Sequence, residues 1–274
     1  MKKKLLAPLL SLLLFFSCSE DDDQVAQPRP EPQSPCYLLE QTISSADSDS
    51  TIKYTYDELN QVVRTEHYKQ EELLAIRTYS YNNAGQLTEE RLFQPDGESE
   101  INFTTYSYNP GGRLSRYDVK QRVPELEIIR RVASFKAVYD TQGRLTSATD
   151  YLYLNNAESN NGSVSISYPV NRPIATTVRS AQGETYSVSY AQDTLSFAPL
   201  SATPIFQQRR PGIGYPNLHN FTSLTATNGD KEEISSLSYT SSLEKNEQGY
   251  PIAETIKFND KREERITYTY NCPD

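Results

Sequence analysis

Tryptophan is absent from this chain of 274 residues, which holds only one methionine, two histidines and three cysteines. Zinc sites usually need three or four ligands, so His67 and His219 do not indicate a metal centre. The GxSxG, HExxH, P-loop and Rossmann motifs are missing as well, and with them the usual sequence evidence for catalysis. We therefore predict no cofactor.

Large clusters of lysine and arginine are also missing. The formal net charge is −9, and removal of residues 1–17 with their three lysines would make it −9 − 3 = −12. An acidic chain is repelled by phosphate backbones, which argues against nucleic acid as a partner. The same charge disfavours contact between the folded body and anionic lipid headgroups.

The long apolar run is Leu5–Phe16, which follows three lysines and is too short to span a bilayer. A basic segment followed by such a run is typical of a secretory signal. Ser17-Cys18 resembles a lipobox, in which the cysteine is acylated. The acidic run Glu20–Asp23 resembles the export signal of Bacteroidota lipoproteins, which places them on the outer face of the outer membrane. The alternative is an ordinary cleaved signal with an acidic linker.

Three regions follow from this organisation. Residues 1–17 are the expected signal peptide, and residues 18–35 are a tether with four prolines among polar residues. Residues 36–274 then form a single β-repeat domain. Twenty tyrosines must supply much of its buried area.

The domain consists largely of copies of one sequence unit, which is clearest in residues 79–87. Two tyrosines two positions apart lie on one face of a strand. Asp or Asn then begins a type I turn, and a residue with positive φ closes the hairpin. The residues expected to have positive φ, one in each copy, are Asn60, Gly85, Gly112, Gly143 and, in a degraded copy, Gly249.

The unit resembles the YD repeat of Rhs and teneurin proteins, and residues 106–114 and 139–145 carry the resemblance most closely. With the expected anchor, the chain resembles Bacteroidota surface lipoproteins of unknown function that are assigned a porin-like fold. The resemblance implies a β-barrel and brings no catalytic residues with it.

The fold expected from these repeats is all-β, an antiparallel meander rolled into an open or closed barrel-like sheet of a dozen or more strands. A polar loop at 155–161, a tight hairpin turn at Asn228-Gly229 and a strand near 232–240 are further expectations. Charged residues alternate along strands such as 62–69. An Arg or Lys in a lipid-facing band costs about 2–4 kcal/mol, so we expect a barrel that does not span the membrane.

Residues 193–221 interrupt the repeats with four prolines. Such segments are functional loops, plugs or edge covers. If the chain binds glycans, the contacts expected are Tyr215, Asn217, His219 and Phe221. The alternative is that the segment covers an open edge of the sheet.

Two functions remain open from the sequence. The first is a monomeric surface lipoprotein that acts as a non-catalytic binding or scaffold module, for a glycan or for an outer-membrane partner. The second is a surface hydrolase of glycosidase type with an unrecognised carboxylate pair.

After acylation of Cys18, two cysteines remain, Cys36 at the start of the domain and Cys272 at its end. In an oxidising compartment we expect a disulfide between them, which requires the first and last strands to be neighbours. The alternative is two separate thiols at frayed ends.

Overall fold

The computed structural model describes residues 35–46, 49–123, 126, 128–155, 157–168, 175–193, 195–203, 206 and 220–272. All of them belong to the second of two compact units, Glu31–Asp274. The signal peptide, Cys18 and nearly all of the tether lie outside the described residues, and those assignments stay predictions.

Sixteen strands make up the described part of the chain. They are β1 (Tyr37–Ser45), β2 (Asp49–Tyr56), β3 (Val62–Lys69), β4 (Glu72–Tyr81), β5 (Leu87–Phe93), β6 (Glu100–Tyr108), β7 (Leu114–Val123), β8 (Ile128–Tyr139), β9 (Leu145–Leu154), β10 (Ala157–Ser167), β11 (Ala175–Ser180), β12 (Thr185–Asp193), β13 (Asn220–Thr227), β14 (Tyr239–Lys245), β15 (Pro251–Phe258) and β16 (Glu263–Asn271).

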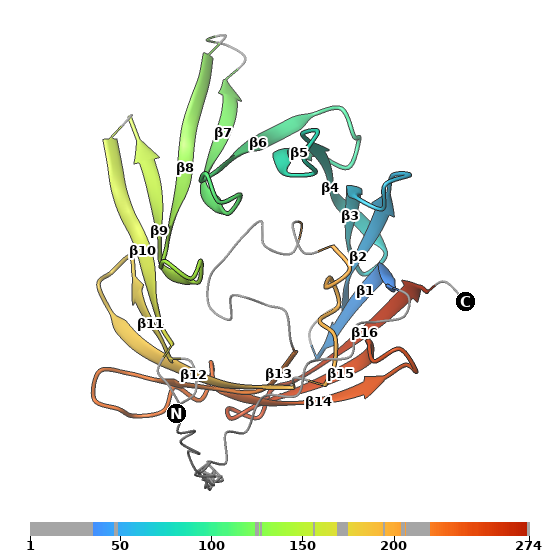
Figure 1. Ribbon diagram of the computed structural model, residues 1–274, viewed down its shortest axis with the longest axis vertical. Helices are drawn as coiled ribbons and strands as arrows, with labels where there is room; N and C mark the ends of the chain where they lie inside the picture. Colours follow the sequence, from blue (N-terminus) through green and yellow to red (C-terminus); the bar gives the residue numbers. More distant parts are fainter. Residues whose placement is uncertain are drawn as a thin grey trace, which may run out of the picture. The chain divides into compact units, whose positions relative to one another are not determined.

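The strands form a closed barrel in which each strand pairs with its neighbours in the sequence and β1 pairs with β16 (Figure 1). Every pairing is antiparallel, so the structure confirms the predicted all-β meander. Of the two predicted forms, an open or a closed barrel, the structure shows the closed one. A disulfide of 2.12 Å joins Cys36 to Cys272 beside the β1–β16 seam.

The repeat turns share one geometry. In the turn from Asn82 to Gly85, the Gly85 amide donates to the Asn82 carbonyl at 2.9 Å, and the Asn82 amide donates to the Gln86 carbonyl at 2.9 Å. Gly85 has a φ of 73°, a conformation that favours glycine because it has no Cβ. The other expected positions also have positive φ: Asn60 (58°), Gly112 (74°), Gly143 (78°) and Gly249 (85°).

A ladder of tyrosine hydroxyl groups ties each repeat to the one before it. The second tyrosine of each unit donates to the backbone carbonyl at the start of the preceding return strand, at 2.7–2.9 Å. The pairs are Tyr56 with Leu38, Tyr81 with Val62, Tyr108 with Leu87, Tyr139 with Leu114, and Tyr168 with Leu145. The ladder thus continues to Tyr168, one step beyond the repeats visible in the sequence.

The two faces of the wall differ in chemistry. Thr65 contacts Tyr79 on the inner face at 3.0 Å, so its strand neighbours Arg64 and Glu66 point outward. The outer face carries a series of ion pairs: Arg64–Glu66 (2.9 Å), Arg91–Glu89 (2.6 Å), Arg91–Glu100 (2.7 Å), Arg116–Asp118 (2.6 Å) and Arg131–Asp118 (3.1 Å). Charged pairs therefore lie on the outside of β3 and of β5 to β8.

The predicted polar loop at 155–161 is wrong. Residues 157–160 continue β10 and pair with 151–154 of β9, while Asn155 turns the chain with a φ of 50°. These residues are polar because their side chains are exposed, so their polarity did not indicate a loop.

The predicted strand near 232–240 is also wrong, because β14 begins at Tyr239. A turn forms at Asn228 as expected, but the residue with positive φ is Lys231 (66°) and not Gly229. The segment after it makes a single bridge, Thr227 to Glu233, and then a second turn in which the Ser238 amide donates to the Ile234 carbonyl.

Candidate functional site

The interior of the barrel is partly filled by the chain between β12 and β13, drawn in orange inside the ring in Figure 1. Phe206 packs edge-on against Tyr79 and Tyr54, with ring centroids 4.8 and 6.4 Å apart, and only 2% of its surface is exposed. Phe197 stacks on Tyr250 at 4.9 Å. The described part of this segment is thus fixed against the inner wall.

Asn220 attaches the start of this segment to the wall. Its side-chain amide donates to the Ser196 hydroxyl at 2.9 Å and to the Phe197 carbonyl at 2.8 Å. Because Asn220 is the first residue of β13, these bonds connect both ends of the excursion. The arrangement is that of an internal plug, one of the roles expected for residues 193–221.

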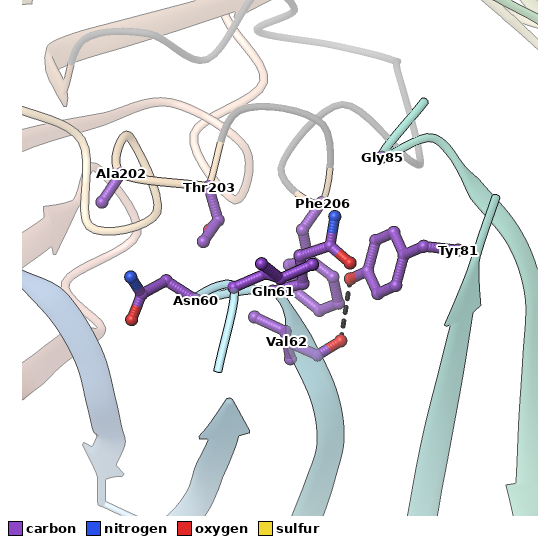
Figure 2. A pocket seen from close by; sticks show the side chains of 9 residues that line it. Asn60, Gln61, Val62, Tyr81, Gly85, Ala202, Thr203 and Phe206 are labelled. Carbon is purple, nitrogen blue, oxygen red and sulfur yellow. Dashed lines mark hydrogen bonds between the residues drawn. The ribbon is translucent and has the colours of Figure 1, made fainter. Parts of the chain in front are cut away.

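A small cavity lies where the plug meets the first two repeat turns, as Figure 2 shows. Its volume is about 170 Å³, and its lining comprises Leu59, Asn60, Gln61, Val62, Tyr81, Gly85, Ala202, Thr203 and Phe206. The Tyr81 hydroxyl already donates to Val62, and Phe206 is buried. The cavity therefore offers the amides of Asn60 and Gln61, and it is smaller than the 300–1,000 Å³ usual for ligand sites.

A second cavity of about 230 Å³ lies among β8 to β11. Apolar side chains including Phe135 and Val164 line it together with two residues of opposite charge, Asp150 and Arg179. It is also small for a ligand site.

A buried carboxylate occupies the inner wall beside the first tyrosines of the repeats. Glu90 is 2% exposed, accepts a hydrogen bond from Tyr106 at 2.7 Å, and forms an ion pair with Arg77. Next to this group, Thr65 bonds the Tyr79 hydroxyl and lies 3.1 Å from Nε2 of His67. Each of these polar groups is therefore engaged within the wall.

Glu254 on β15 is a second inward carboxylate. It accepts hydrogen bonds from Tyr268 at 3.0 Å and Ser241 at 2.5 Å. Burial raises the pKa of Tyr268, and the Glu254 charge raises it further. Burial, together with the same carboxylate, raises the pKa of Tyr239 to about 12. Both tyrosines stay protonated at neutral pH, and Tyr268 acts as a donor to Glu254.

The residues proposed from sequence for glycan contact are only partly placed. Tyr215, Asn217 and His219 lie outside the described residues. Phe221 lies on β13, where its ring packs 4.7 Å from that of Tyr190. It is a wall residue, and this packing explains its identity without a ligand.

Several features were not recognisable in the sequence. Glu90 and Arg77 meet only because of the β4–β5 register, and nothing distinguishes Glu90 from neighbouring acids in the sequence.

Among the described residues, no group of three or more His, Cys, Asp or Glu side chains is arranged to hold a metal ion. The described part of the chain also has no helix with the length and hydropathy of a membrane span.

Comparison with known proteins identifies the fold. No protein family and no curated protein matches the chain in sequence. A porin-like protein from Bacteroides uniformis has a similar structure, with a TM-score of 0.57 at 13% identity over 86% of this chain and 99% of that chain. One from Bacteroides vulgatus gives a TM-score of 0.52 at 13% identity with the same coverage. The chain thus has the fold of porin-like proteins from Bacteroides.

Proposed function

We propose that this chain is a lipid-anchored protein of the outer cell surface whose barrel is a non-catalytic binding or scaffold module. The ligand class proposed is a glycan or an outer-membrane protein partner. The anchor is Cys18, expected to follow the signal peptide and to be acylated.

The observation that carries the proposal is the paired charge on the outer wall. Arg91 is bonded to Glu89 and Glu100, and Arg116 to Asp118, on strands in the middle of the sheet. An arginine on the lipid face of a barrel costs about 2–4 kcal/mol at the bilayer midplane. A wall with several such residues is stable in water, so the barrel needs a separate attachment to the membrane.

The plug also supports a role other than passage of solutes. Phe206 and Phe197 occupy interior space and contact the wall. A protein that conducts solutes needs an open lumen, whereas a scaffold gains stability from a filled one.

The contacts of the inward carboxylates favour a binding role over hydrolysis. General acid and base groups must reach a substrate proton directly or through one water. Glu90 is fully buried against Arg77 and Tyr106, and Glu254 is bonded to Tyr268 and Ser241. These contacts give both carboxylates a structural role.

A glycan array tests the binding proposal. We expect the intact protein to bind a subset of glycans, and Tyr215→Ala with His219→Ala to weaken that binding at least ten-fold. Tyr151→Ala on the outer face is the matched aromatic control and should bind normally. Turnover of generic glycoside or ester substrates by the intact protein, abolished by Glu90→Gln or Glu254→Gln, would instead establish the hydrolase alternative.

A further inference from the structure

One row of residues crosses β8 to β11, which form the green to yellow side of the ring in Figure 1. Phe135 on β8 pairs in register with Asp150 on β9, and Asp150 pairs with Gly162 on β10. Gly162 in turn pairs with Ser180 on β11. Residues directly opposite each other on antiparallel strands share one face of the sheet, so these four residues lie on the same face.

This face points into the barrel. The ring of Phe135 stacks on that of Tyr117, with centroids 4.8 Å apart, and Tyr117 pairs in register with Tyr106. Tyr106 belongs to the buried cluster that contains Phe206, the plug residue inside the barrel. The row that ends at Ser180 therefore belongs to the inner wall.

Gly162 leaves a gap in this row, and all four residues line the second cavity, of about 230 Å³. A β-bulge lies between Asn160 and Gly162, where the Gly162 amide donates to the Asn160 side-chain oxygen at 2.8 Å. A side chain at position 162 would begin 3.1 Å from the Arg179 carbonyl. Bulges often lie beside binding sites, and this one keeps space open next to Asp150.

The cavity is lined by an accessible negative charge. Asp150 is exposed, whereas the inward carboxylate Glu90 is buried. Arg179 also lines the cavity, but its neighbour Val178 packs in the inner cluster with Val164, so the Arg179 side chain points outward. A carboxylate has about four acceptor positions, which suit a ligand with several hydroxyl groups.

Ser180 places a hydroxyl group across the gap from Asp150. Its oxygen accepts a hydrogen bond from the Glu184 amide at 3.2 Å, so its proton can be donated to a ligand. Apolar side chains that include Ala148 and Val164 border the same cavity. A sugar residue has hydroxyl groups around its rim and C–H groups on its faces, and this combination of polar and apolar surface matches it.

We infer that this cavity binds one neutral sugar residue of a glycan, with Asp150 accepting hydrogen bonds from its hydroxyl groups. The cavity is smaller than pockets that enclose a whole ligand, so it suits a single residue of a longer chain. The lining holds one carboxylate, whereas glycosidases need two, which favours binding over hydrolysis. The inference rests on the proposed glycan-binding role and places a contact outside residues 193–221.

Saturation-transfer NMR on the intact protein tests this subsite. The probes are the methyl glycosides of glucose, galactose and mannose, with glucosamine as the charged comparison. Asp150→Asn keeps the size of the side chain and removes its charge, and Ser180→Ala removes the hydroxyl group. Asp230→Asn, which changes an exposed carboxylate in the turn after β13, is the matched control. Circular dichroism verifies that each variant keeps its strands.

We expect the native protein to bind at least one of the three methyl glycosides. Asp150→Asn should weaken that binding roughly five-fold or more, because a hydrogen bond to a charged acceptor becomes one to a neutral acceptor. Ser180→Ala should weaken the binding by a smaller factor, and Asp230→Asn should leave it unchanged.

The absence of saturation transfer to all three methyl glycosides would overturn the inference, as would equal affinities of the native protein and Asp150→Asn. Binding of glucosamine about ten-fold tighter than that of the glucoside would also overturn it, because the ligand group would then be an ammonium. On the glycan array, binding that Asp150→Asn leaves unchanged would reject this subsite while the proposed function stands.

Discussion

The hydroxyl of Tyr108 donates a hydrogen bond of 2.8 Å to the backbone carbonyl of Leu87, 21 residues earlier in the sequence. The bond joins one repeat to the next through a carbonyl at the start of a return strand. Because four other tyrosines make the same bond, the wall of the barrel is held by a side-chain ladder in addition to its backbone hydrogen bonds.

Removal of this hydroxyl should therefore destabilise the barrel. Tyr108→Phe leaves the Leu87 carbonyl without its partner, and we expect a loss of about 1–2 kcal/mol of unfolding free energy in urea titrations. Tyr151→Phe is the control, since the Tyr151 hydroxyl makes no hydrogen bond in the described part of the chain, and it should change stability by less than about 0.5 kcal/mol. Equal losses for the two variants would contradict a specific ladder.

Gly143 should be the most sensitive of the turn glycines. Its φ is 78°, and the guanidinium of Arg113 from the preceding turn lies where a Cβ would be placed. We expect Gly143→Ala to cost about 1–2 kcal/mol, mainly from backbone strain, with a smaller contribution because the exposed end of the Arg113 side chain must move aside. Thermal or urea unfolding measures this loss.

Gly229→Ala is the matched control for Gly143, because φ is not positive there and no atom lies within 4 Å of the added methyl group. It should change stability by less than about 0.5 kcal/mol. In an Arg113→Ala background, Gly143→Ala should cost less than in the native chain. An undiminished cost would show that Arg113 plays no part.

Alkaline pH should unfold the barrel through its buried tyrosines. Burial raises the pKa of Tyr108 and, with Glu254, that of Tyr239 from 10.0 to about 12. A raised folded-state pKa means that the unfolded chain loses its protons first as pH rises. The stability that the folded chain gains from burying these protonated hydroxyls is therefore complete below pH 10 and is lost between pH 10 and 12. Urea titrations between pH 8 and 12, with tyrosinate absorbance recorded in parallel, measure it, and constant stability over this range would contradict the burial of these hydroxyls.

The Cys36–Cys272 disulfide encloses 272 − 36 + 1 = 237 residues. The chain-entropy model gives roughly 5 kcal/mol for such a loop, and measured gains are often smaller. We expect reduction, or the double variant Cys36→Ala/Cys272→Ala, to lower stability by about 2–5 kcal/mol without loss of strand content in circular dichroism. Free thiols at both positions in non-reducing peptide maps of the native protein would contradict the closure.

The barrel could be predicted from the sequence because residues close together in the chain determine its turns and strands. Asp or Asn followed three residues later by Gly, or by Asn60 in the first copy, specifies each repeat turn, and paired tyrosines specify one face of each strand. The same reasoning failed at 155–161, because polar residues also occur in a strand exposed beyond the core. It failed at 232–240, because Lys231 closes a turn that the Asn-Gly pair suggested would be closed by Gly229.

The interior was not predictable, since it depends on register and on long-range contacts. Phe206 reaches Tyr79 across more than a hundred residues, and Glu90 meets Arg77 only in one alignment of β4 and β5.

We propose that this barrel is attached to a membrane by Cys18 and does not span it. Membrane fractionation of the Cys18→Ala variant distinguishes the two arrangements, after a high-salt wash that removes electrostatic contacts between protein and membrane. We expect the folded variant in the soluble fraction and the native protein in the membrane fraction. Retention of the washed variant with the membrane would contradict this attachment through Cys18, because it would place the charged outer wall within the bilayer.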